Sequence, residues 1–144
     1  MVWKPHVTVA AVVLRDGKFL LVEEETESGL AFNQPAGHLE EGESLVDAVV
    51  REALEETAYH FVPTHLVGVY NWKHPDKDDK TYLRFAFAGE LRGFEAEREL
   101  DDGIVAARWL TLDEIRATQA RHRSPLILRC IEDMLAGKRY PLDL

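Results

Sequence analysis

Apolar runs alternate with polar breaks along the chain, and the first two runs are rich in branched residues. These runs cover residues 7–14 and 19–22, and Asp16-Gly17 between them is a strong hairpin signal. We therefore expect two paired strands, followed by an acidic loop over residues 23–27. Further apolar runs predict strands at residues 30–33, 62–72, 81–91 and 106–110.

Three later segments carry the signals of helices. A serine or threonine that can cap free backbone donors precedes each one. The predicted helices are residues 45–58 after Ser44, a helix from Thr111 to about Ala120, and a helix from Ser124-Pro125 to Ala136, which Gly137 ends. Because strands and helices are interspersed, we expect an α/β (α+β) fold with a mixed sheet, forming one domain over residues 1–144.

Charge and composition narrow the class of protein. The 144 residues contain 17 Lys+Arg against 26 Asp+Glu, a net charge of −9, and 46% of them are hydrophobic. This apolar content argues against a disordered acidic tail, and the negative field argues against nucleic acid as a partner. The chain has one cysteine and no apolar run near the roughly 18 residues of a membrane helix, so we expect a cytoplasmic protein without a membrane partner.

The surplus carboxylates are concentrated on one predicted helix. Glu52, Glu55 and Glu56 fall within a sector of roughly 100° on that helix. Like charges at this spacing repel one another unless a cation lies among them. Oxygen ligands without cysteine or paired histidine favour Mg²⁺ or Mn²⁺ over zinc. Arg51 can hold Glu43 or Glu55 in one orientation.

The full spacing is more specific than the glutamates alone. A glycine is followed by one glutamate and then by Arg-Glu-x-x-Glu-Glu, at Gly37, Glu43 and residues 51–56. Chance gives such a pattern with a probability on the order of 10⁻⁵ in a chain of this length. Residues 37–59 resemble the Nudix box of hydrolases that cleave diphosphate linkages with magnesium. Ala58 replaces the consensus glycine, so we expect a slightly longer or differently capped helix.

The resemblance implies a Nudix-type α/β/α sandwich and assigns roles to the box residues. It implies that Mg²⁺, with Mn²⁺ as a substitute, is held by Gly37, Glu52, Glu55 and Glu56. It also implies that Arg51 and Glu43 orient these ligands. One carboxylate must accept the proton of the attacking water. Glu52 is the first candidate for this base, and Asp102 within the acidic stretch 95–102 is the distal alternative.

The resemblance extends beyond the box to one subfamily of bacterial phosphatases. It is carried by residues 4–10, 33–40, 83–85, 123–126 and 139–142. It implies release of inorganic phosphate from 4-amino-2-methyl-5-hydroxymethylpyrimidine pyrophosphate and from nucleoside di- and triphosphates. Two alternatives stay open: a nucleoside triphosphate pyrophosphohydrolase, and a catalytically silent nucleotide-binding domain. We expect a monomer or weak dimer.

Three further residues are candidates for binding a small-molecule pyrophosphate substrate. The amide of Gln34 can read a pyrimidine edge or simply cap its loop. Trp72 can stack on a base, and Arg84 can hold a phosphate. Strand alternation places Tyr82 and Arg84 on one side of their strand, so both can line one pocket.

Overall fold

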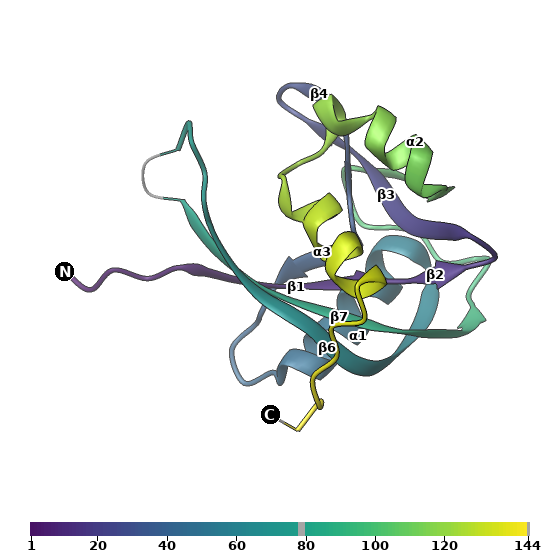
Figure 1. Ribbon diagram of the computed structural model, residues 1–144, viewed down its shortest axis with the longest axis horizontal. Helices are drawn as coiled ribbons and strands as arrows, with labels where there is room; N and C mark the ends of the chain where they lie inside the picture. Colours follow the sequence, from purple (N-terminus) through teal and green to yellow (C-terminus); the bar gives the residue numbers. More distant parts are fainter. Residues whose placement is uncertain (78–79, 144) are drawn as a thin grey trace.

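The computed structural model describes residues 1–77 and 80–143, which form two β-sheets and the helices that pack on them (Figure 1). The first sheet has the order β5-β1-β7-β6, in which only the β1–β7 pair is parallel. Its strands are β1 (His6–Val12), β5 (Ala36–His38), β6 (Tyr59–Lys73) and β7 (Thr81–Phe94). The second sheet contains β2 (Leu14–Arg15), β3 (Lys18–Thr26), β4 (Gly29–Asn33) and β8 (Ile104–Leu110).

The first sheet is the middle layer of the molecule. The helices are α1 (Leu45–Thr57), α2 (Leu112–Ala117), α3 (Leu126–Leu135) and the short 3₁₀ turn η1 (Gln119–Arg121). Val9 and Ala11 of β1 join one core cluster with α1, whereas Val12 joins the cluster that contains α3 and β3. The expected α/β fold with a mixed sheet is confirmed. Among the described residues, no helix has the length and apolar character needed to span a membrane.

The β6–β7 hairpin extends beyond the rest of the first sheet, on the same side as the N-terminus (Figure 1). The two strands pair from Lys73↔Thr81 back to Tyr59↔Phe94, and the register shifts at three places along the pairing. Asp78 and Asp79 of the polar segment 74–80 lie outside the described residues.

Two strand predictions require correction. Asp16 and Gly17 adopt the left-handed conformation of a turn, but this turn joins β2 to β3. Strand β1 pairs with β5 and β7 in the other sheet. The predicted acidic loop is largely a strand, because β3 continues to Thr26 and pairs with both β4 and β8. Arginines neutralise Glu23 there, so its charge does not oppose burial.

The predicted helix over residues 45–58 is confirmed, but its end differs from the expectation. Ser44 accepts a hydrogen bond from the Asp47 backbone N–H, as predicted. The helix ends at Thr57, and Ala58 adopts φ = 65° while its N–H donates to the Leu54 carbonyl. The prediction of a different cap is therefore wrong, because an alanine adopts the left-handed conformation in which glycine is favoured.

Candidate active site

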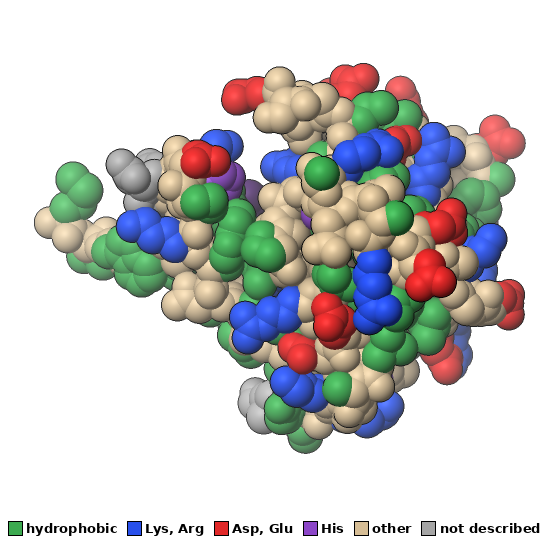
Figure 2. All heavy atoms as spheres, turned by 45° about the horizontal axis from the view of Figure 1, so that its top comes forward, with side chains coloured by type: hydrophobic (Ala, Val, Ile, Leu, Met, Phe, Trp, Pro, Cys, Tyr) green, Lys and Arg blue, Asp and Glu red, His purple; other side chains and the backbone are tan. Residues whose placement is uncertain are grey.

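A cleft of about 1160 Å³ is lined by half of the predicted site residues. Glu52, Glu56 and Gly37 line one end, and Trp72 and Arg84 line the floor that the first sheet provides. The β3–β4 hairpin and the segment after η1 cover the opposite side. In Figure 2, histidine side chains are visible in the recess between the projecting β6–β7 hairpin and the body of the molecule.

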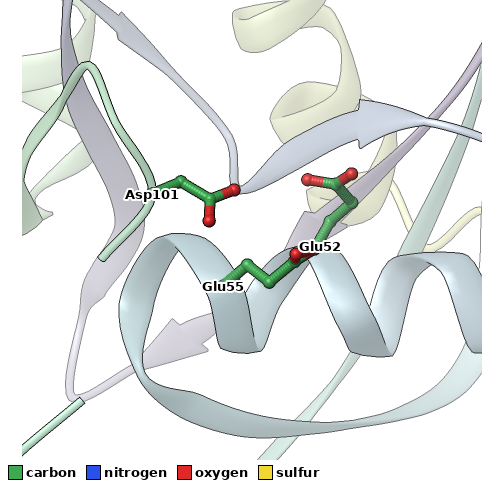
Figure 3. Close-up of side chains that lie close together, drawn as sticks. All are labelled: Glu52, Glu55 and Asp101. Carbon is green, nitrogen blue, oxygen red and sulfur yellow. The ribbon is translucent and has the colours of Figure 1, made fainter. Parts of the chain in front are cut away.

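Three carboxylates from two segments meet at the α1 end of the cleft (Figure 3). Glu52 and Glu55 come from α1, and Asp101 comes from the loop before β8. One carboxylate oxygen from each lies within 4.8 Å of the other two. The Asp101 backbone N–H also donates to the Glu55 carbonyl at 3.1 Å, which fixes the loop against the helix end. This donor set of hard oxygens suits a magnesium-like cation.

Arg51 organises the glutamates of the cluster. Its Nε donates to Glu43 at 2.6 Å, and its NH1 group donates to Glu52 and Glu55, each at 2.7 Å. Its NH2 group donates to the His38 carbonyl at 3.1 Å, which ties α1 to β5. The Arg51 guanidinium lowers the pKa of Glu43 to about 2. One cation thus orients three carboxylates without itself being a metal ligand.

Glu56 is the most deeply buried carboxylate of the cleft, with 9% of its surface exposed. It accepts a hydrogen bond from the Ala36 backbone N–H at 2.9 Å. Burial, reinforced by the charges of Glu52, Glu24 and Asp101, raises the pKa of Glu56 to about 9. Burial likewise raises the pKa of Glu52. A divalent cation would favour the charged form of both groups, so the residues present fit such an ion.

Gly37 allows β5 to lie directly against α1. A Cβ atom at this position would be 2.1 Å from the Glu52 carboxyl carbon. Only glycine leaves room for the Glu52 side chain in its observed place. This contact explains in steric terms why a glycine belongs to the same sequence pattern as the helix glutamates.

The predicted substrate-binding residues lie on the floor of the cleft and behind it. Arg84 is 6% exposed and donates to Gln34 at 2.7 Å and to Asn33 at 2.9 Å. Gln34 is buried, and its Nε2 donates to the Ile127 carbonyl at 2.8 Å. The rings of Trp72 and Tyr82 stack with their centroids 6.0 Å apart. Tyr82 and Arg84 line the same cleft, as strand alternation predicts.

The structure adds two residues to the predicted set. Asp101 and Asp102 are both exposed, but it is Asp101 whose carboxylate lies beside those of Glu52 and Glu55. The sequence shows that residues 95–102 are acidic. It does not show which of these carboxylates faces α1, because that depends on the conformation of the loop. Asn33 was also missed; its only sequence signal is a polar amide next to Gln34 where a strand ends.

A family model, a characterised relative and a solved structure all match this chain over most of its length. Residues 4–130 match the NUDIX domain family. The chain is 45% identical to "Phosphatase NudJ" of Escherichia coli strain K12 over 143 residues, covering 99% of this chain and 91% of that protein. It is 55% identical to the structure of a NUDIX hydrolase from Nitrosomonas europaea, with a TM-score of 0.94 over 97% of this chain and 95% of that one.

A more distant structure shares the fold alone. It is the NUDIX domain of Shewanella oneidensis NrtR complexed with ADP ribose, at 19% identity and a TM-score of 0.73. The match covers 93% of this chain and 88% of that domain. The architecture is therefore retained at low identity.

Proposed function

This chain belongs to the Nudix hydrolase family and acts on phosphoanhydride bonds, and from that premise we propose that it is a Mg²⁺-dependent phosphatase of small pyrophosphate monoesters. The proposed substrates are 4-amino-2-methyl-5-hydroxymethylpyrimidine pyrophosphate and nucleoside di- and triphosphates. The proposed inorganic product is phosphate. The near-full-length identity to a phosphatase supports this choice within the family.

Glu52, Glu55 and Glu56, with the Gly37 backbone and Asp101 beside them, are the residues that would hold Mg²⁺ or Mn²⁺. When bound, the cation would offset charge on the diphosphate and lower the pKa of a coordinated water. Arg51 keeps Glu52 and Glu55 oriented by donating to both. Glu43 in turn fixes the Arg51 guanidinium by accepting from two of its nitrogens.

Glu52 is our first candidate for the group that accepts the proton of the attacking water. Its side chain faces the cleft and is held by Arg51. Desolvation makes it a stronger base than an exposed glutamate, because burial raises its pKa. Asp101 and Asp102 provide the alternative base from the distal loop.

The organic part of the substrate would bind at the other end of the cleft. Trp72 and Tyr82 present stacked rings there, which suit a planar pyrimidine or purine. Arg84 lines the cleft floor, and the buried Gln34 completes the proposed substrate-binding set through the hydrogen bond that it accepts from Arg84.

Two observations together support the proposal. Arg51 holds the carboxylates of Glu52 and Glu55 in place, and the chain is 45% identical to a phosphatase. The test is to identify the products from the pyrimidine pyrophosphate, GDP, GTP, ADP-ribose and a dinucleoside polyphosphate, with Mg²⁺ and with EDTA. We expect orthophosphate from the first three, only with Mg²⁺. Pyrophosphate as the main inorganic product of GTP would favour the pyrophosphohydrolase, and binding without turnover would favour the silent domain.

We also propose that the protein acts in the cytoplasm as a monomer or weak dimer, built as one domain over residues 1–144. The buried free thiol of Cys130 is in keeping with a reducing compartment. Light scattering at micromolar concentration tests the oligomeric state.

A further inference from the structure

Arg84 differs from the other arginines around the cleft in the charge of its partners. Arg51 binds Glu43, Arg121 binds Glu23, and Arg123 binds Glu24. Arg84 donates instead to the neutral side-chain amides of Asn33 and Gln34. Within residues 1–77 and 80–143, no carboxylate lies within ion-pair distance of Arg84.

A buried guanidinium without a counter-charge is energetically unfavourable, so the surrounding residues must hold it in place. Arg84 is almost completely buried, yet it borders the open cleft. Gln34 cannot release it easily, because the Gln34 amide is itself anchored on the Ile127 carbonyl of α3. Burial raises the pKa of the nearby Cys130 thiol, so this group remains neutral and does not neutralise Arg84.

The strand register places Arg84 between the two ends of the cleft. Thr8 of β1 pairs with His38 on one side and with Arg84 on the other. Residues two strands apart are separated by about 10 Å at their Cα atoms. His38 adjoins Gly37 at the carboxylate end, whereas Tyr82 lies two residues from Arg84 along β7 and pairs with Trp72 of β6. Arg84 therefore lies on the cleft floor with the carboxylate end two strands away and the aromatic rings two residues along its own strand.

We propose that Arg84 binds the phosphate that remains on the organic product, and that Asn33 and Gln34 keep its charge available by holding it with neutral amides. This inference rests on the proposed function, because it assigns one part of the diphosphate substrate to one residue. The substrate phosphate supplies the counter-charge that the protein withholds. Asn33 and Gln34 are positioning residues, since they act through Arg84.

Asn33→Asp is the sharpest test, because it keeps the shape and the acceptor oxygen for Arg84 while adding a negative charge. The added carboxylate should pair with Arg84 and compete with the substrate phosphate. We expect the KM for GDP to rise about 10- to 100-fold, the range of a lost charged hydrogen bond. The kcat should change less than threefold, because the contact is present in both ground and transition states.

Asn71→Asp is the matched control. Asn71 is an exposed residue of β6 that pairs with Leu83, outside the cleft, and its substitution changes the net charge equally. We expect wild-type KM and kcat for this variant. An equal rise of KM in both variants would assign the effect to net charge and contradict the role of Arg84.

Equilibrium binding separates phosphate recognition from base recognition. GDP and guanosine are titrated calorimetrically in EDTA, so that hydrolysis does not interfere. In Asn33→Asp the affinity for GDP should fall while that for guanosine stays unchanged. An equal loss for both ligands, an unchanged GDP affinity, or a wild type that binds GDP no more tightly than guanosine would overturn the proposal.

Two further variants distinguish a loss of phosphate binding from a general structural defect, and one of them tests the role of Gln34. Arg84→Gln removes the cation, and Gln34→Glu places a carboxylate on the other side of the guanidinium. Both should show the same selective loss of GDP over guanosine, whereas a merely structural role would lower both affinities together. Absence of phosphate release by the wild type would reject the proposed function, but these titrations would still test Arg84.

Discussion

Glu56 is the residue in which burial and function conflict most directly. Its carboxyl group is held by the Ala36 N–H in a largely desolvated position, where its pKa is about 9. In the absence of a cation the protonated form is therefore favoured at neutral pH. The protein tolerates this arrangement because a bound divalent ion would stabilise the ionised form.

We predict that Glu56→Gln abolishes most turnover and leaves the fold intact. The amide resembles the protonated acid in shape but is a poor ligand for Mg²⁺, so kcat/KM should fall by about two orders of magnitude or more. The melting temperature without metal should be close to that of the wild type. Glu41→Gln, an exposed substitution on the loop before α1, is the control for activity and stability. Wild-type activity in Glu56→Gln would remove Glu56 from the site.

The same site shows why part of it could be predicted from the sequence. Gly37, Glu43, Arg51 and the helix glutamates lie close together along the chain, so their spacing is visible in the sequence, and helical periodicity places Glu52, Glu55 and Glu56 on one face of α1. Asp101 reaches the same point through a loop whose course no local pattern specifies. The amide partners of Arg84 were hidden for a similar reason, because the β4 end and β7 meet only through tertiary packing.

At the scale of elements, α1 and the β3–β4 hairpin define opposite sides of the cleft. Capping residues and periodicity predict α1 because these signals are local. Strand β5 and the acidic part of β3 were not predicted, because their stability comes from partners distant in sequence. In β3, Glu23 is paired with Arg108 of β8 and with Arg121 after α2. Tertiary ion pairs thus convert a loop-like sequence into a strand.

We predict that Ala58→Gly stabilises the end of α1. Ala58 has φ = 65°, a conformation that costs an L-residue about 1 kcal/mol and costs glycine little. The gain is reduced by the loss of one buried methyl group, so we expect about 0.5 kcal/mol in the free energy of unfolding by urea denaturation. Destabilisation by more than about 1 kcal/mol would show that packing of the methyl group outweighs backbone strain.

The ion pairs of Glu23 in the β3–β4 hairpin lead us to predict that the free energy of unfolding decreases at acidic pH. The hydrogen bond from Arg121, with that from Arg108, holds the pKa of Glu23 below its ordinary value of 4.5. A group with a lower pKa in the folded state contributes stability above its unfolded pKa and loses it as pH falls through the folded one. Stability should therefore decrease below about pH 4.5.

Glu23→Gln should flatten that decrease and cost about 1–2 kcal/mol at pH 7. Urea denaturation at several pH values between 3 and 7 measures both effects. Glu27→Gln, at the tip of the same hairpin, provides a comparison because Glu27 makes no ion pair within the described part of the chain. An acid limb as steep in Glu23→Gln as in the wild type would assign it to other carboxylates.

At the scale of the whole molecule, the net charge of −9 is unevenly distributed. Arg51 offsets part of the acidic cluster at one end of the cleft, while Arg84 is a cation in its middle. An acidic protein can thus recognise a phosphate ester, because the local charges that meet the substrate differ from the sum over the chain. Composition alone predicts this overall charge but not its arrangement.

We predict that Mg²⁺ stabilises the folded protein, because the ion binds a site that only the folded state assembles. At 100 times its Kd, the free energy of unfolding should rise by about 2.7 kcal/mol. Differential scanning calorimetry with Mg²⁺ and with EDTA measures the shift in melting temperature, which Glu56→Gln should largely remove. An equal shift in that variant would place the bound ion elsewhere.

The sharing of one Arg51 guanidinium among Glu43, Glu52 and Glu55 also constrains how the sequence can change over time. Losing any one member leaves the others mispaired, so a second loss in the group removes little that the first has not already removed. Mutational effects within the group are then strongly epistatic. Descendants of this sequence are expected to retain the whole set or to lose it together, and intermediates with part of it should be rare.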